Sequence, residues 1–264
     1  MNFPAHIEKI IQRNYNFNFG DYINRGFETV QKNLGLFIGF LLIYMMINGM
    51  FEAVADMMGY YPGTAFNILF TIVVEPCLIA GAYLAAHKST ENDNLRFDDF
   101  FKGFDKIKPL AISALIQTSL YLVFLSPLFI FGDANLTHLT SGTLPFDYLT
   151  DNLMNLGILY FIALLPVIYL SIAWSFAPFL IIFHEMEAVP ALEASRRIIT
   201  KKWFVFAGFF FVIILIAILG VLGFIIGILF TVPAAVCMLY AAFRDVVGMP
   251  NEEEDDILDH LIMV

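Results

Sequence analysis

Residues 203–243 read WFVFAGFFFVIILIAILGVLGFIIGILFTVPAAVCMLYAAF, a run of 41 positions that contains no Asp, Glu, Lys or Arg. A single α-helix of that length would be about 60 Å long, roughly twice the ~30 Å thickness of the hydrocarbon core of a bilayer. The run therefore has to fold back on itself, and Gly220 and Gly223 offer the natural turn. It predicts two transmembrane helices, over 203–219 and 223–243.

Four more apolar stretches precede this run. They predict transmembrane helices over 34–56, 64–87, 109–131 and 153–183. The composition agrees, since 59% of the residues are hydrophobic and 14% are charged, against about 45–50% and about 25% in soluble domains. The last of the four stretches is longer than a bilayer requires, and Pro166 and Pro178 suggest either kinks in it or an extension beyond the lipid. We expect an all-α polytopic bundle of six transmembrane helices.

The basic residues give this bundle an orientation. All 14 Lys and Arg residues precede the first span, lie between the second and third or the fourth and fifth, or follow the sixth. Positive residues mark the cytoplasmic side, so both termini are expected there, in the inner membrane of a bacterium. The predicted domains are a cytoplasmic segment over 1–33, a membrane domain over 34–244 and an acidic cytoplasmic tail over 245–264.

Three short amphipathic segments stand just before the odd-numbered spans. They begin near Phe19, Phe97 and Val189. Their apolar and charged residues alternate at helical spacing, which is typical of helices that lie in the membrane interface. We expect three interfacial helices on the cytoplasmic side. They either mark three repeated units of one interfacial helix and one hairpin, or reflect only the amphipathic character of loops near a membrane.

One carboxylate lies near the middle of the second predicted span. Glu75, followed by Pro76, would cost about 2.5–3.5 kcal/mol at that depth unless it is protonated, paired or next to water. Asn48, Gln117 and Ser171 lie at similar depth in three other spans. Together these residues predict a polar site near the bilayer midplane. The alternative is a hydrogen-bond cluster that only joins the helices.

A cluster of four basic residues follows the third amphipathic segment: Arg196, Arg197, Lys201 and Lys202. Such clusters attract anionic lipid headgroups by about 1 kcal/mol per charge. Membrane topology alone also requires positive charge at this position. We therefore expect membrane lipids as partners, with anionic headgroups on the cytoplasmic side, and possible membrane-protein partners.

Other kinds of chemistry have no support in the sequence. The net charge is −10, and no basic patch predicts binding to nucleic acid. Cys77 and Cys237 both lie in apolar segments, which is typical of small buried residues rather than of metal or redox sites. Neither a P-loop nor a G-x-S-x-G motif occurs. We predict no cofactor, no metal and no catalytic residue.

Several short motifs carry a resemblance. They are FDDFFKGF at 97–104, AWSFAP at 173–178, PALEASRR at 190–197, KW at 202–203, GFIIG at 223–227, TVP at 231–233 and YAAFRD at 240–245. In this order they resemble a family of uncharacterised bacterial membrane proteins, similar to the membrane domain fused to some glycerophosphodiester phosphodiesterases. The resemblance implies a six-helix membrane domain with no established activity. The catalytic phosphodiesterase domain has no counterpart, so that activity is not expected.

Two functions remain open at this point. The first is a non-enzymatic component that organises the membrane or binds a partner through its interfacial helices. The second is a small transporter or lipid-handling protein with a midplane site around Glu75. A cavity that reaches Glu75 would favour the second function, whereas a dry bundle with Glu75 hydrogen-bonded inside would favour the first. An enzyme that acts on a lipid is a distant third.

Overall fold

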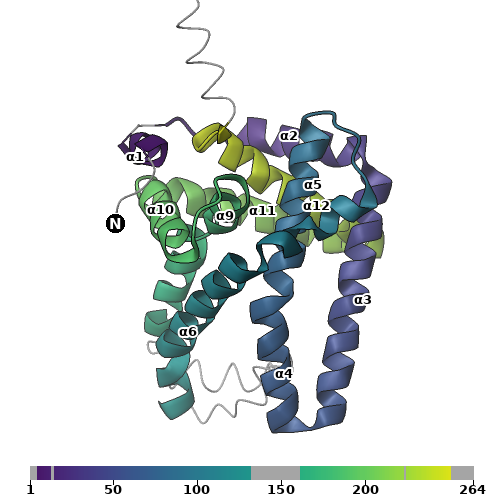
Figure 1. The fold of residues 1–264 in the computed structure, drawn as a ribbon, viewed down its shortest axis with the longest axis vertical. Helices are drawn as coiled ribbons and strands as arrows, with labels where there is room; N and C mark the ends of the chain where they lie inside the picture. The colour runs from purple at the N-terminus through teal and green to yellow at the C-terminus, as the bar shows by residue number, and fades with distance from the viewer. Residues whose placement is uncertain (1–4, 13–14, 132–160, 223, 251–264) are drawn as a thin grey trace, which may run out of the picture.

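The computed structural model describes residues 5–12, 15–131, 161–222 and 224–250. It is 88% helical, and the described residues include no strand. Six helices are long and apolar enough to cross a membrane: Leu34–Met58, Tyr60–Thr90, Phe97–Pro127, Phe161–Phe183, Trp203–Leu222 and Gly227–Val246. The predicted all-α bundle with six spans is thus confirmed, and the chain is a multi-pass membrane protein (Figure 1).

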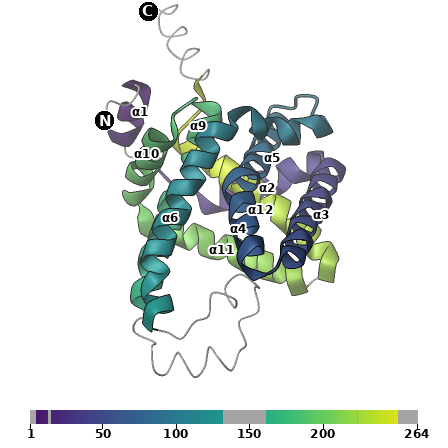
Figure 2. The same ribbon diagram turned by 60° about the horizontal axis from the view of Figure 1, so that its bottom comes forward.

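The first two spans form a hairpin. Helix α3 (Leu34–Met58) turns at Gly59 into α4 (Tyr60–Val73), which continues after Val74 as α5 (Glu75–Thr90). The second span is therefore longer than the predicted 64–87. In Figures 1 and 2 this hairpin and α6 (Ile107–Phe131) extend in one direction, whereas the last two spans run obliquely across them.

The fourth span changes direction close to one of its two prolines. Its described part begins at Phe161, and residues 153–160 of the predicted helix lie outside the described residues. Turn geometry interrupts the helix at 174–176, and α9 (Ala177–Phe183) follows with Pro178 as its second residue. The helix continues through Pro166 without a break. The helix is thus interrupted just before Pro178 and continuous at Pro166.

The last two spans are α11 (Trp203–Leu222) and α12 (Phe224–Val246). The chain folds back as predicted, but Gly220 lies inside α11 and not in the turn. A Cβ atom on Gly220 would stand 2.2 Å from Thr231 Oγ1, and one on Gly227 would stand 2.1 Å from the Gly220 carbonyl oxygen. Gly220 therefore allows the two helices to touch, as small residues do between membrane helices.

The three amphipathic segments are α2 (Phe19–Lys32), the 3-10 helix η1 (Phe97–Lys106) and α10 (Ala188–Thr200). Helix η1 packs against α5, and α10 packs against α9, in each case the second span of the hairpin before it. Helix α2, which precedes the first hairpin, packs against α12, the second span of the last hairpin, so that the three contacts form a ring. The contact recurs three times in the same order, as three repeated units would require. Each segment contributes a small residue to its contact, Gly26, Gly103 or Ser195.

The contact between η1 and α5 is the closest of the three. A Cβ atom on Gly81 would stand 1.7 Å from the Phe100 carbonyl oxygen, so the two backbones touch. Beside this contact Asp99, only 1% exposed, accepts from Lys88 Nζ at 2.8 Å and from Lys102 Nζ at 2.5 Å. The second oxygen of this carboxylate accepts from the backbone N–H of Arg96 at 2.9 Å and so caps η1.

The second spans of the three hairpins meet in one aromatic core. Tyr83 of α5 stacks on Phe179 of α9 with ring centroids 4.0 Å apart, and Phe179 stacks on Phe243 of α12 at 4.7 Å. His87 Nδ1 lies 2.8 Å from the Tyr240 hydroxyl at the edge of this core. The C-terminal ends of these spans are thereby fixed relative to one another.

The segment before α2 is also part of the fold. Helix α1 (Ala5–Gln12) packs on α10, and the Tyr15 hydroxyl donates to the Ile198 carbonyl oxygen at 2.9 Å. Phe17 fits edge-on between Phe206 and Phe209 of α11. The sequence predicted only an amphipathic helix within 1–33, and these contacts anchor the segment to the third hairpin.

Candidate functional site

The break between α4 and α5 places a carboxylate in the middle of a membrane span. Pro76 has no N–H and cannot continue the helical ladder. The backbone N–H groups of Cys77 and Leu78 both donate to the Val74 carbonyl oxygen at 3.1 Å. These contacts give both N–H groups an acceptor next to the break, as an apolar environment requires. Glu75 lies at this bend, halfway along the 31-residue span Tyr60–Thr90.

A pocket of about 370 Å³ lies next to this bend, between the second span and α6. Its lining residues are Thr71, Glu75, Pro76, Ile79, Leu110, Ser113, Ala114, Gln117, Thr118, Tyr121 and Pro178. The set contains one carboxylate, one amide and four hydroxyls, and no Lys, Arg or His is among the described residues that line it. Glu75 and Gln117, predicted from separate spans, thus share one pocket. We call it the Glu75 pocket.

A tyrosine on α3 binds the Glu75 carboxylate from the other side. The Tyr44 hydroxyl donates to Glu75 Oε1 at 3.0 Å. Asn48, one turn further along α3, donates from Nδ2 to the Tyr44 carbonyl oxygen at 2.9 Å. Asn48 does not line the pocket, so its part in the predicted site is indirect.

A row of polar side chains on α6 forms the opposite wall. Gln117 Nε2 donates to Ser113 Oγ at 3.1 Å, and the Tyr121 hydroxyl is hydrogen-bonded to the Ser171 hydroxyl at 3.1 Å. Ser171 is exposed and, like Asn48, reaches the pocket only through a tyrosine. Tyr44, Ser113 and Tyr121 were not predicted as site residues. Their spacing of four from predicted residues, which places them on the same helix faces, is the signal that could have identified them.

A second cavity of about 290 Å³ lies on the other side of α5. It is lined by Phe37, Phe40, Leu41, Tyr44, Leu78, Ile79, Ala82, Tyr83, Val232, Pro233 and Val236. We call it the apolar cavity, because its described lining holds no charged residue. Ile79 lines both cavities, and Tyr44 lines the apolar cavity while it binds Glu75. The two spaces therefore share Ile79 as a wall, and the Tyr44–Glu75 hydrogen bond joins residues that line them.

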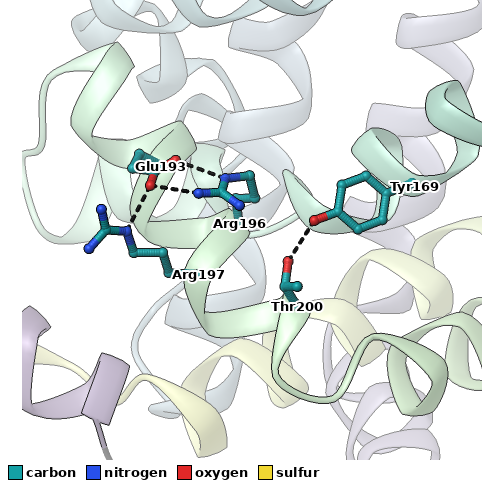
Figure 3. Close-up of polar contacts among 5 residues, drawn as sticks. All are labelled: Tyr169, Glu193, Arg196, Arg197 and Thr200. Carbon is teal, nitrogen blue, oxygen red and sulfur yellow. Dashed lines mark hydrogen bonds and ion pairs between the residues drawn. The ribbon is translucent and has the colours of Figure 1, made fainter.

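The predicted basic cluster is held by a carboxylate of its own helix (Figure 3). Glu193 accepts from Arg196 Nε and Nη2, each at 2.8 Å, and from Arg197 Nε at 2.7 Å. The bidentate bond from Arg196, followed by the bond from Arg197, lowers the pKa of Glu193 to about 2, although burial opposes this shift. Glu193 therefore stays ionised, and the pairs persist, well below neutral pH.

The same cluster joins α10 to its neighbours. The Tyr169 hydroxyl lies 3.0 Å from Thr200 Oγ1, as Figure 3 shows. Lys202 Nζ donates to the Tyr15 carbonyl oxygen and lies 5.1 Å from the centroid of the Tyr15 ring. Protein partners are thus present for Arg196, Arg197 and Lys202. These contacts stabilise the connection between the fourth and fifth spans. Contact with anionic lipid stays a prediction for these residues and for Lys201.

The described residues hold no group of three or more His, Cys, Asp or Glu side chains that could bind a metal ion. Cys77 and Cys237 are both buried. No protein family, curated protein or solved structure matches the chain. The resemblance to phosphodiesterase membrane domains therefore stays a prediction, and the fold and the pocket together define a multi-pass membrane protein with a carboxylate-containing pocket at mid-span.

Proposed function

We propose that this protein binds a small ligand in the Glu75 pocket and acts as a small transporter or a lipid-handling protein. The observation that supports this proposal is the pocket itself, which brings Glu75 together with polar groups of α6. An ionisable side chain at mid-span is costly in a membrane, and in membrane proteins such residues commonly mark a ligand or ion path. The bond from Tyr44 occupies one carboxylate oxygen and leaves the other for a ligand.

The alternative function, membrane organisation through interfacial helices, has less support. Helix α10 buries seven of its 13 residues within the protein, and η1 buries Asp99, Phe100 and Gly103. Both arginines of α10 are bound to Glu193. These surfaces are therefore used largely to hold the hairpins together, which leaves less of them to act on the lipid leaflet.

A thiol placed in the pocket tests the proposal. Thr118→Cys in protein stripped of lipid is expected to react with N-ethylmaleimide, because the pocket opens to the surroundings. Restoring a total lipid extract of the host membrane should slow the reaction about tenfold or more, as an occupant that covers the thiol would. Peptide mass spectrometry measures the rate, and the buried Cys77 and Cys237 serve as internal references.

The matched control is Thr64→Cys, at the other end of α4 and away from the pocket. Its reaction should not depend on the added lipid. A rate at position 118 that the extract leaves unchanged, or changes only as much as at position 64, would contradict binding in this pocket.

We also propose that both termini lie in the cytoplasm, because all 14 basic residues then lie on the side that positive residues mark. The resemblance to bacterial membrane proteins supports the inner membrane of a bacterium as the location. A membrane-impermeant maleimide added to intact spheroplasts should label Tyr61→Cys, in the first turn of α4, where the side chain is 82% exposed. Asp93→Cys, an exposed position between α5 and η1, should be labelled only after lysis. The reverse pattern would overturn the orientation.

A further inference from the structure

The described lining of the Glu75 pocket contains several hydrogen-bond acceptors and one carboxyl group. Glu75 is the one ionisable acid of its described lining, and no basic side chain offsets it. Gln117 uses its amide N–H on Ser113, which leaves its carbonyl oxygen to accept from a ligand. The Tyr121 ring adds an aromatic face of the kind that attracts cations. Phosphate-containing headgroups find no Lys or Arg here, so the chemistry fits a cation without a phosphate.

The apolar cavity supplies a complementary space. Its walls come from α3, α5 and α12, and its polar atoms belong to the Tyr44 and Tyr83 side chains. Tyr44 is the link, because its ring borders this cavity while its hydroxyl donates to Glu75 at 3.0 Å. Ile79 borders both spaces. A molecule with one charged end at Glu75 would have the apolar cavity, which shares Ile79 with the Glu75 pocket, as the adjacent space for a hydrocarbon chain.

We infer that the ligand of the Glu75 pocket is a single-chain cationic amphiphile, with its amine at Glu75 and its hydrocarbon chain in the apolar cavity. This inference rests on the proposed function and adds the class of ligand. An ammonium group is costly in hydrocarbon unless it is paired, and Glu75 provides the partner at that depth. The hydrocarbon chain gains the burial that the apolar cavity offers.

Titration of the purified full chain in a neutral detergent, followed by native mass spectrometry, tests the class of ligand. The probes are dodecylamine, dodecanol and dodecyl phosphate, which share one chain and differ in charge. Dodecylamine should bind with a Kd about tenfold or more below that of dodecanol, as a charge-assisted hydrogen bond provides. Dodecyl phosphate should bind most weakly, since it meets Glu75 with no basic partner in the pocket.

Two pairs of variants locate the two ends of the probe. Glu75→Gln should abolish the preference for dodecylamine over dodecanol, whereas Glu52→Gln, an exposed carboxylate on α3, should keep it. Val236→Phe narrows the apolar cavity and should weaken both probes alike. Val54→Phe, on an exposed position of α3, should weaken neither. Each variant is first checked for a single peak in size-exclusion chromatography.

The outcomes separate the inference from the proposed function. Equal affinity of the wild-type protein for dodecylamine and dodecanol would overturn the inference, and this comparison needs no variant to fold. If the two affinities were equal but Ala114→Phe, which fills the Glu75 pocket, still abolished probe binding, the proposed function would stand without the inference on ligand class. If filling that pocket changed the binding of no probe, both would fail.

Discussion

Replacement of Gly81 by alanine is expected to prevent the protein from folding into a stable, monodisperse form. The added Cβ would stand 1.7 Å from the Phe100 carbonyl oxygen, and this obstacle is backbone that cannot rotate away. Gly103 stands on the other side of the same contact, where a Cβ would lie 2.0 Å from the Cys77 carbonyl oxygen. Separating α5 from η1 would also break the ion pair between Lys88 and Asp99. We expect a loss of about 3 kcal/mol or more.

The measurement is the yield of the monodisperse peak in size-exclusion chromatography, together with the melting temperature in detergent. Gly103→Ala should behave like Gly81→Ala, because the Cβ atoms that the two substitutions add both enter the interface between α5 and η1. Gly35→Ala is the matched control, since no heavy atom lies within 4 Å of a Cβ at that position. A Gly81→Ala protein with the same melting temperature as the wild type would mean that η1 does not pack on α5 as described.

The number of spans could be predicted from the sequence because lipid imposes a simple rule. A helix in hydrocarbon must be apolar over its whole length, so the 41-residue run from Trp203 to Phe243 had to contain two spans. The way in which the helices touch follows a different rule. Gly220 looked like a turn residue because glycine is common in turns, yet it lies inside α11 where Thr231 approaches it. Single-chain patterns do not distinguish these two uses of glycine.

The candidate site could be predicted in part. Glu75 and Gln117 were identifiable because polar groups are rare at mid-span, and the structure brings both into one pocket. Asn48 and Ser171 were grouped with them by depth alone, and depth does not determine which face of a helix a residue occupies. Tyr44 was missed because tyrosine is amphipathic and is common near membrane surfaces, so it gave no signal by itself. The packing of α3 on the second span brings the Tyr44 hydroxyl to Glu75.

The prediction that bears most directly on function concerns Ala114, a half-buried residue of α6 that lines the Glu75 pocket. Ala114→Phe places a ring in the pocket without a change of charge, and it leaves Glu75 and its bond to Tyr44 in place. The pocket is open on one side, so the added side chain should fill it at little cost in stability. The variant should therefore fold like the wild type and lose the ligand.

Native mass spectrometry of protein purified in mild detergent measures this loss directly. The wild-type protein and Ala53→Phe, an exposed site on α3, should both carry a bound small molecule that is released on activation. Ala114→Phe should carry it at an occupancy about tenfold lower or less, because the added ring and the ligand exclude each other. Equal occupancy in all three proteins, or a wild-type protein that carries no small molecule, would contradict a ligand site in the Glu75 pocket.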